Sequence, residues 1–182
     1  MTNIFSGDSD CSMHIQTRIG KRFFVVKDNL CGHVGLYDFH FLGRTIMANC
    51  EEEKLANIEV IEKARGDVLI AGLGIGLIVL PIMKKKNVTS VDIIEKYQEV
   101  IDLIKPQLPL NNKVTIIYQD IMDFIPTKKY DLIYVDTLPE IQYLEDEKKA
   151  RTRNGKFITD TELAEEFKKY LKGGGEALCY HG

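Results

Sequence analysis

Three glycines within five residues are the feature that most constrains how this chain can fold. Gly72, Gly74 and Gly76 follow a short apolar run at 68–71 and precede a second apolar segment at 77–85. Glycines between a strand and a helix let the backbone turn sharply and approach a ligand, because no side chain is in the way and unusual dihedral angles are tolerated. The segment 68–85 is therefore predicted to form a strand, a ligand-binding turn and a helix.

Apolar strands and helical segments alternate along the chain after residue 67. Further strands are expected at 88–94, 114–118, 131–135 and 176–180, and helices at 51–63, 77–85, 97–106 and 163–171. This alternation predicts an α/β protein of the Rossmann-like, doubly wound type, with a mostly parallel sheet covered by helices on both faces. Right-handed crossovers then place the ligand beyond the carboxyl ends of the strands.

The first part of the chain has a different texture. Residues 1–17 show little periodicity and are expected to be a loose or partly ordered arm, whereas 22–47 contain β-prone runs that predict a small antiparallel hairpin or three-stranded piece. We therefore divide the chain into an N-terminal arm and β segment, 1–49, and a ligand-binding domain, 50–182. The glycines at 173–175 are expected to end the last helix as a C-cap does.

An acidic residue closes the second predicted strand of the larger domain. Glu95 stands 19 residues after Gly76, which is the spacing expected of an acid that accepts hydrogen bonds from ribose hydroxyls. A dinucleotide fingerprint starting at Gly72 would require glycine at position 77, where the chain has Leu77. The pattern therefore favours a ribose-containing ligand without a pyrophosphate.

Residues 67–76, which read Asp-Val-Leu-Ile-Ala-Gly-Leu-Gly-Ile-Gly, resemble motif I of the class I S-adenosylmethionine-dependent methyltransferases. Residues 91–95, 118–121, 130–136 and 171–175 are similar to that family's second strand, the stretch after its third strand, its fourth strand and the turn before its fifth. The resemblance covers roughly residues 50–182. It implies the methyltransferase type of fold, C-terminally short because the family usually adds two more strands, and S-adenosylmethionine as cofactor.

The resemblance also implies which residues form the site. The cofactor-binding residues would be Gly72, Leu73, Gly74, Ile75, Gly76, Glu95, Lys96, Asp120, Ile121 and Asp136. Glu95 would bind the ribose and Asp120 the adenine amino group, although Asp120 could simply cap the short helix that follows it. Asp136 is the candidate catalytic residue, as a general base; it could also bind the methionine amino group or simply begin a turn.

Two features resemble the spermidine-synthase-like branch of this superfamily. One is the β-rich segment and helix before motif I, and the other is glutamate at position 95. In that branch, the acid at the position of Asp136 acts on an amine nucleophile. The chain departs from the branch at 136–140, which read Asp-Thr-Leu-Pro-Glu in place of Asp-Ser-Ser-Asp-Pro, and at 50–53, where Cys-Glu-Glu-Glu replaces a Tyr-His-Glu element.

Three functions follow from these patterns. The first is methyl transfer from S-adenosylmethionine to a small-molecule acceptor. The second is aminopropyl transfer from the decarboxylated cofactor to a diamine, for which Asp136, Glu140, Glu145 and Asp146 would supply an acidic pocket. The third is a cofactor-binding domain without catalysis, or a partner subunit. The segment 150–156 would be a loop over the site or an ordinary exposed loop.

Composition narrows the range of partners and compartments. The net charge of −3 supplies no global attraction to nucleic acid, so no nucleic-acid partner is expected. Four scattered cysteines form no CxxC pair or metal-ligand spacing, which predicts no metal and a cytoplasmic protein with reduced thiols. The apolar stretch 68–83 is interrupted by glycines and is too short for a bilayer, so no membrane association is expected.

A sheet that ends at its fifth strand predicts an exposed edge. This edge would be paired in a homodimer or covered by the N-terminal hairpin.

Overall fold

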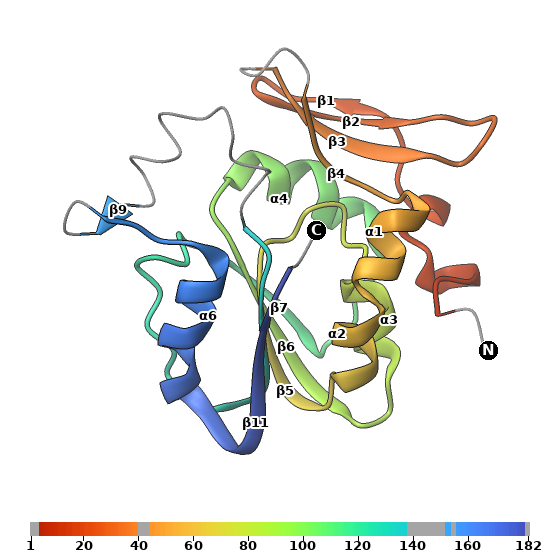
Figure 1. Ribbon diagram of the computed structural model, residues 1–182. Helices are drawn as coiled ribbons and strands as arrows, with labels where there is room; N and C mark the ends of the chain where they lie inside the picture. The colour runs from red at the N-terminus through yellow and green to blue at the C-terminus, as the bar shows by residue number, and fades with distance from the viewer. Residues whose placement is uncertain (1–3, 40–43, 138–151, 154–155, 181–182) are drawn as a thin grey trace.

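The larger of the protein's two main sheets contains five parallel strands (Figure 1). A computed structural model describes residues 4–39, 44–137, 152–153 and 156–180. The five strands lie in the order β11-β8-β5-β6-β7. Their bounds are β5 Gly66–Ala71, β6 Val88–Glu95, β7 Val114–Tyr118, β8 Tyr130–Val135 and β11 Leu171–Cys179. Numbered along the chain, this order is 3-2-1-4-5, which is that of doubly wound nucleotide-binding sheets. The predicted Rossmann-like α/β fold is confirmed.

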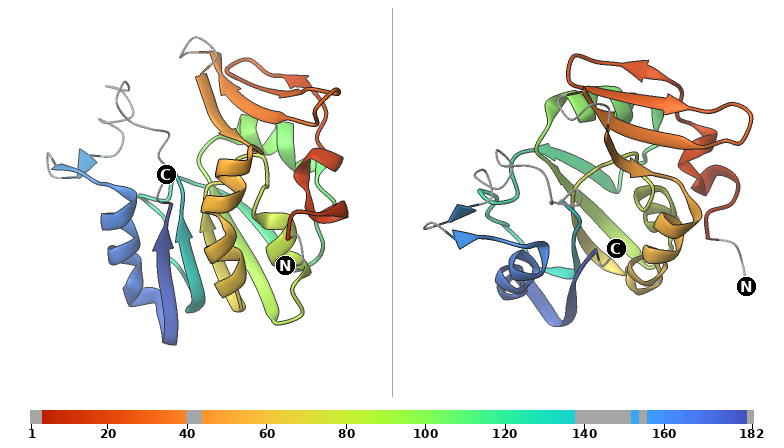
Figure 2. Two further views of the ribbon diagram at one scale, coloured as in Figure 1. Left: turned by 45° about the vertical axis from the view of Figure 1, so that its right-hand side comes forward. Right: turned by 45° about the horizontal axis from the view of Figure 1, so that its top comes forward.

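Helices cover both faces of this sheet (Figures 1 and 2). Their bounds are α1 Glu51–Ala56, α2 Ile58–Lys63, α3 Val79–Lys84, α4 Gln98–Ile104 and α6 Asp160–Phe167. Alternate residues of β5 belong to different cores, because side chains along a strand point to opposite faces. Val68 and Ile70 pack with α2, α3 and α4, whereas Leu69 and Ala71 pack with α6. The strand is therefore apolar on both sides.

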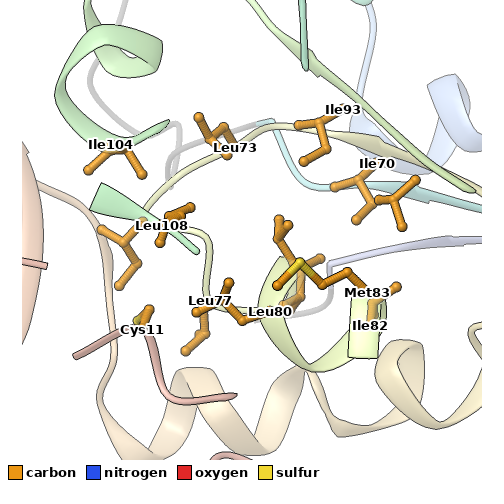
Figure 3. Packing of buried hydrophobic residues seen from close by; sticks show 14 of the residues in the cluster. Cys11, Ile70, Leu73, Leu77, Leu80, Ile82, Met83, Ile93, Ile104 and Leu108 are labelled. Atoms are coloured by element: carbon orange, nitrogen blue, oxygen red, sulfur yellow. The ribbon is translucent and has the colours of Figure 1, made fainter. Parts of the chain in front are cut away.

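The core on the side of α2, α3 and α4 is the larger of the two (Figure 3). Ile70, Leu77, Leu80 and Ile93 are each at most 1% exposed. Burying each of these side chains stabilises the fold by about 1.5–3 kcal/mol. Cys11, from the N-terminal segment, lies in the same cluster and is fully buried. This core thus joins the first residues of the chain to the α/β part.

The N-terminal segment forms a second sheet of four antiparallel strands, one more than the expected three-stranded piece. They are β1 Arg18–Ile19, β2 Phe23–Lys27, β3 Val34–Asp38 and β4 Arg44–Ala48, in that order across the sheet. Figure 1 shows this sheet beside the end of the parallel sheet at which β11 terminates. The Glu99 carboxylate at the start of α4 accepts hydrogen bonds from the Arg22 and Phe23 N–H groups (2.9 and 3.3 Å), so the two sheets are linked.

Of the two expectations for the N-terminal arm, loose or partly ordered, the structure contradicts the first. Residues Gly7–Ser9 and Cys11–Met13 form two 3₁₀ turns, and Phe5, Cys11 and Ile15 are buried in the large core. Turns of three residues are too short to produce a hydrophobic period. The anchoring of this arm was therefore not visible as a pattern in the sequence.

Two predicted helices also differ from the structure. The helix expected at 51–63 is divided into α1 and α2 at Asn57, and the helix before β11 ends at Phe167, followed by a 3₁₀ turn, Lys168–Tyr170. The glycines at 173–175 are part of β11, not a C-cap. Pairing with β8 shifts register between Leu171 and Glu176, and the glycines form this irregular stretch.

The remaining expectations concern the segment 140–156, the edge strand of the sheet and the membrane. Glu140, Glu145, Asp146 and most of the loop 150–156 lie outside the described residues. Short strands β9 Thr152–Arg153 and β10 Lys156–Phe157 pair with each other. Within the part of the chain that the structure describes, the N-terminal strands form their own sheet and do not pair with β11. Among the described residues, no helix is long and apolar enough to cross a membrane.

Candidate functional site

The glycine turn connects β5 to α3 at the carboxyl end of the parallel sheet. Its φ values are +102° at Gly72, +51° at Gly74 and +76° at Gly76, a region that residues with side chains rarely adopt. The Gly72 N–H donates to the Ile94 carbonyl (2.8 Å), which ties the turn to β6. The predicted sharp turn between strand and helix is confirmed, with α3 beginning at Val79.

Protein atoms fill the space that side chains would occupy at the first two glycines. A Cβ atom at Gly72 would lie 2.2 Å from the carbonyl oxygen of Asp136, and one at Gly74 would lie 2.3 Å from Sδ of Met47. Met47 belongs to β4, so the N-terminal sheet reaches the turn. Packing alone therefore requires glycine at position 72, where the neighbouring atom belongs to the backbone. At position 74 the flexible Met47 side chain can shift, and the positive φ angle is the stronger reason for glycine.

Glu95 turns its carboxylate toward the glycine turn. Oε2 accepts a hydrogen bond from the Leu73 N–H (3.0 Å), and Oε1 accepts one from the Tyr97 N–H (2.8 Å). The side chain is 7% exposed. Burial raises the pKa of Glu95, while the hydrogen bonds from Leu73 and Tyr97 act in the opposite direction. The structure thus joins two predicted parts of the site, the turn and the acid that closes β6.

Lys96 and Asp120 meet one strand further along the sheet. Their side chains form an ion pair (Nζ to Oδ2, 3.4 Å), and Oδ1 of Asp120 accepts a hydrogen bond from the Met122 N–H (2.9 Å). Asp120 therefore holds the backbone that follows it, as the capping alternative expects, although this segment is a turn and not the expected short helix. Ile121 is buried in the smaller core. The adenine contact of Asp120 and the cofactor contacts of Lys96 and Ile121 stay predictions.

Asp136 follows the end of β8 and lies against the glycine turn. Its N–H donates to the Ala71 carbonyl (3.1 Å). Burial, and then the nearby carboxylates of Asp160 and Glu53, raise the pKa of Asp136 to about 7. Among the described residues, no hydrogen-bond donor is recorded for its carboxylate. An acid in this state exchanges a proton readily near neutral pH.

Glu53 and Tyr180 also reach this region, and neither was singled out in the sequence. Buried Asn57 accepts a hydrogen bond from the Tyr134 hydroxyl (2.9 Å) and donates one to the Glu53 carbonyl (2.8 Å), which orients α1 over β8. The Tyr180 hydroxyl bonds the Glu53 side chain; burial, Glu53 and Asp136 raise the pKa of Tyr180 to about 12. The acidic run at 51–53 was a visible signal for Glu53.

Asp160 is the third acid of the group and comes from the start of α6. It is 8% exposed and accepts hydrogen bonds from the Thr137 N–H (3.0 Å) and Thr137 hydroxyl (2.8 Å). The capping box formed by Thr159 and Glu162 could have marked this helix start in the sequence. Nothing in the sequence indicated that Asp160 would approach Asp136.

These contacts define the chemistry available at the carboxyl ends of β5, β6 and β8. The buried carboxyl group of Glu95 lies on one side of the glycine turn. The carboxyl group of Asp136, which has a raised pKa, lies on the other side of the turn. The described residues contain no group of histidine, cysteine and acidic side chains that could hold a metal ion. The site can therefore bind hydroxyl or amine hydrogens and move a proton.

Comparisons with known proteins give distant likenesses. No protein-family model matches the chain, and no curated protein matches it. Among solved structures, one that resembles it is DhpI in complex with S-adenosylhomocysteine (SAH), with 18% identity, a TM-score of 0.47, and coverage of 69% of this chain and 54% of that chain.

Two further structures show a similar degree of likeness. The N-methyltransferase NodS from Bradyrhizobium japonicum WM9 has 17% identity and a TM-score of 0.48, over 66% of this chain and 61% of that chain. The plantazolicin methyltransferase BpumL with SAH has 24% identity and a TM-score of 0.42, over 65% and 39%. The chain thus spans less than two thirds of the length of each. The fold class stated above rests on the protein's own strand order.

Proposed function

We propose that this protein is an S-adenosylmethionine-dependent methyltransferase acting on a small-molecule acceptor. The observation that carries the proposal is the Glu95 carboxylate, which is held against the glycine turn by the Leu73 N–H. A carboxylate has about four lone-pair positions. The Leu73 and Tyr97 N–H groups bond it at 3.0 and 2.8 Å, and the backbone of Lys96 also stabilises it. The acceptor capacity that remains suits a ribose hydroxyl.

Leu77 supports a ligand without a pyrophosphate. Its side chain is 1% exposed and lies in the large core, next to the glycine turn. The dinucleotide fingerprint has glycine here so that helix and strand pack closely and the helix N-terminus can receive phosphate. A leucine in the core at this position, before an α3 of only six residues, fits an adenosyl sulfonium ligand better than NAD.

The chain's own residues would bind the cofactor, orient the acceptor and remove its proton. S-adenosylmethionine, when bound, supplies a methyl group already activated by the positive sulfonium. Glu95 would hold the ribose, and Lys96, Asp120 and Ile121 would lie along the adenine. Asp136 would orient the acceptor and take its proton, since a carboxyl group with a pKa of about 7 is matched to neutral pH.

Aminopropyl transfer from decarboxylated S-adenosylmethionine is the second candidate. The carboxylates of Glu53, Asp136 and Asp160 lie close enough to influence one another, and a negative site of this kind favours a cationic amine as acceptor. This arrangement suits a diamine. The same acids would serve an amine methyltransferase. The two candidate functions therefore differ in the cofactor that donates the group, which is S-adenosylmethionine in one and its decarboxylated form in the other.

Ligand-induced thermal stabilisation tests the cofactor. Wild-type protein is heated with S-adenosylmethionine, SAH, the decarboxylated cofactor or NAD. A ligand at 100 times its Kd adds about 2.7 kcal/mol to the free energy of unfolding, which raises Tm by about 5–10 °C for a chain of this size. The proposal predicts this rise with S-adenosylmethionine and SAH. A rise with NAD alone would sink it, and preference for the decarboxylated cofactor would select the second candidate.

Glu95→Gln tests the ribose contact. The variant should lose the ligand-induced rise in Tm, measured from its own ligand-free baseline. Glu59→Gln, on the exposed face of α2, removes the same charge and should keep the rise. Retention of the full rise in Glu95→Gln would remove the ribose role. Stabilisation without turnover on amine acceptors would favour a cofactor-binding domain without catalysis.

A further inference from the structure

The Asp160 carboxylate makes two hydrogen bonds to the residue that follows Asp136. Oδ2 accepts from the Thr137 N–H (3.0 Å) and Oδ1 accepts from the Thr137 hydroxyl (2.8 Å). Hydrogen bonds to an ionised acceptor are stronger than those between neutral groups. Two such bonds to one residue fix its orientation as well as its position.

Asp160 is itself held in place by its helix. Thr159 Oγ1 accepts from the Glu162 N–H (3.1 Å), and the Glu162 carboxylate accepts from the Thr159 N–H (3.0 Å), which closes a capping box around the first turn of α6. Leu163 and Phe167 bury the helix against the sheet. The carboxylate of Asp160 is therefore presented to Thr137 from a rigid element.

The backbone on both sides of Asp136 is restrained by these contacts. On one side its N–H donates to the Ala71 carbonyl of β5 (3.1 Å), and on the other Thr137 is bound by Asp160. We infer that Asp160 is a positioning residue, which fixes the loop after β8 through Thr137 and so holds the Asp136 carboxylate at the glycine turn. This inference rests on the proposed role of Asp136 in group transfer.

The charge of Asp160 contributes separately from its hydrogen bonds. Among the described residues, the groups that interact electrostatically with Asp136 are Glu53 from α1, Asp160 from α6, Tyr134 from β8 and Tyr180 beyond β11. Both acids raise the pKa of Asp136. An asparagine at position 160 would keep an acceptor for the Thr137 N–H and remove the charge. Geometry and charge can therefore be tested with different variants.

The experiment compares wild type, Asp160→Asn and Asp160→Ala. In ligand-free protein, carbon-13 NMR of the carboxyl groups follows the titration of Asp136, identified by its loss in Asp136→Asn. Asp160→Asn should lower the titration midpoint by roughly half a pH unit or more. With S-adenosylmethionine and an amine acceptor, Asp160→Ala should lower kcat by about tenfold or more, since small misplacements of a reacting group are costly. The KM for S-adenosylmethionine should stay within about twofold, because Glu95 and the turn are untouched.

Glu166→Gln is the matched control, since it removes one acidic charge from the exposed side of the same helix. It should change neither the midpoint nor kcat. An unchanged midpoint in Asp160→Asn, or an unchanged kcat in Asp160→Ala, would overturn the inference. If neither wild type nor any variant catalyses the reaction but the titration midpoint of Asp136 falls in Asp160→Asn, the proposed function fails and the placement of Asp160 beside Asp136 stands.

Thr137→Ala covers the case in which the Asp160 variants do not fold. It removes only the hydroxyl bond and leaves the Asp160 charge and the Thr137 N–H contact. The Asp136 midpoint should stay where it is in wild type, while kcat falls by a smaller factor than in Asp160→Ala. A wild-type kcat in Thr137→Ala would then count against positioning through this residue.

Discussion

Gly74→Ala is the substitution that most directly tests the description of the glycine turn. Gly74 has φ of +51°, and an added Cβ would lie 2.3 Å from Sδ of Met47. The left-handed backbone costs about 1–2 kcal/mol for alanine, and overpacking against Met47 costs about 1–3 kcal/mol more. The free energy of unfolding should therefore fall by about 2–5 kcal/mol, which lowers Tm by about 4–20 °C.

The two contributions can be separated because one of them depends on a flexible side chain. Met47→Ala removes the atom that the new Cβ would meet but leaves the φ angle unchanged. In a double-mutant cycle measured by urea unfolding, Gly74→Ala should cost about 1–3 kcal/mol less in the Met47→Ala background. Additive effects of the two substitutions would refute the contact between β4 and the turn.

Gly72→Ala provides the comparison, because its added Cβ would meet a backbone atom. The Asp136 carbonyl oxygen lies 2.2 Å from that position, and Met47→Ala cannot relieve this clash. Gly72→Ala should therefore be equally destabilising in both backgrounds. Rescue of Gly72→Ala by Met47→Ala would show that the two glycines are not packed against separate partners.

The remaining predictions concern the acids and the helices that hold them. Because the pKa of Asp136 is raised from 3.8 to about 7, its contribution to stability is present below pH 4 and is lost as pH rises toward 7. The gain in Tm of Asp136→Asn over wild type should therefore grow from pH 4 to 7 and then level off. A gain in Tm that does not depend on pH would contradict this. Asn57→Ala should cost about 1–3 kcal/mol in urea unfolding, since it leaves the Tyr134 hydroxyl buried without its acceptor; a smaller penalty is expected in a Tyr134→Phe background, and an equal one would contradict the pairing. Thr159→Ala should cost about 1 kcal/mol by loss of the α6 cap, measured as a Tm about 2–4 °C lower, whereas an unchanged Tm would show that the cap is not stabilising.

Much of the fold was predictable because its signals are local. The apolar strand before Gly72, the glycines themselves and the spacing to Glu95 lie within 30 residues, and the structure brings them together. Each of these signals reflects a period or a backbone requirement that a single segment must satisfy by itself. The order of the five parallel strands was not predicted, because it depends on how strands distant in the sequence pair across the sheet.

The parts that were missed depend on contacts between distant segments. Met47 packs on Gly74 from 27 residues earlier, and Asp160 binds Thr137 from 23 residues later. Neither residue belongs to a motif, and such contacts depend on how whole elements pack. The buried arm containing Phe5 was missed for the same reason, since its 3₁₀ turns carry no period.

Glu95 has two duties, and this affects how related sequences should be read. Its carboxylate connects the turn after β5 to the start of α4 through the Leu73 and Tyr97 N–H groups, whether or not a ligand is present. A descendant of this chain that no longer bound any cofactor would still be under selection to keep an acid here, because losing it would leave two backbone donors in need of acceptors. Conservation of this glutamate among related sequences would therefore indicate that the turn has the same structure. Conservation of ligand binding would have to be judged from other positions.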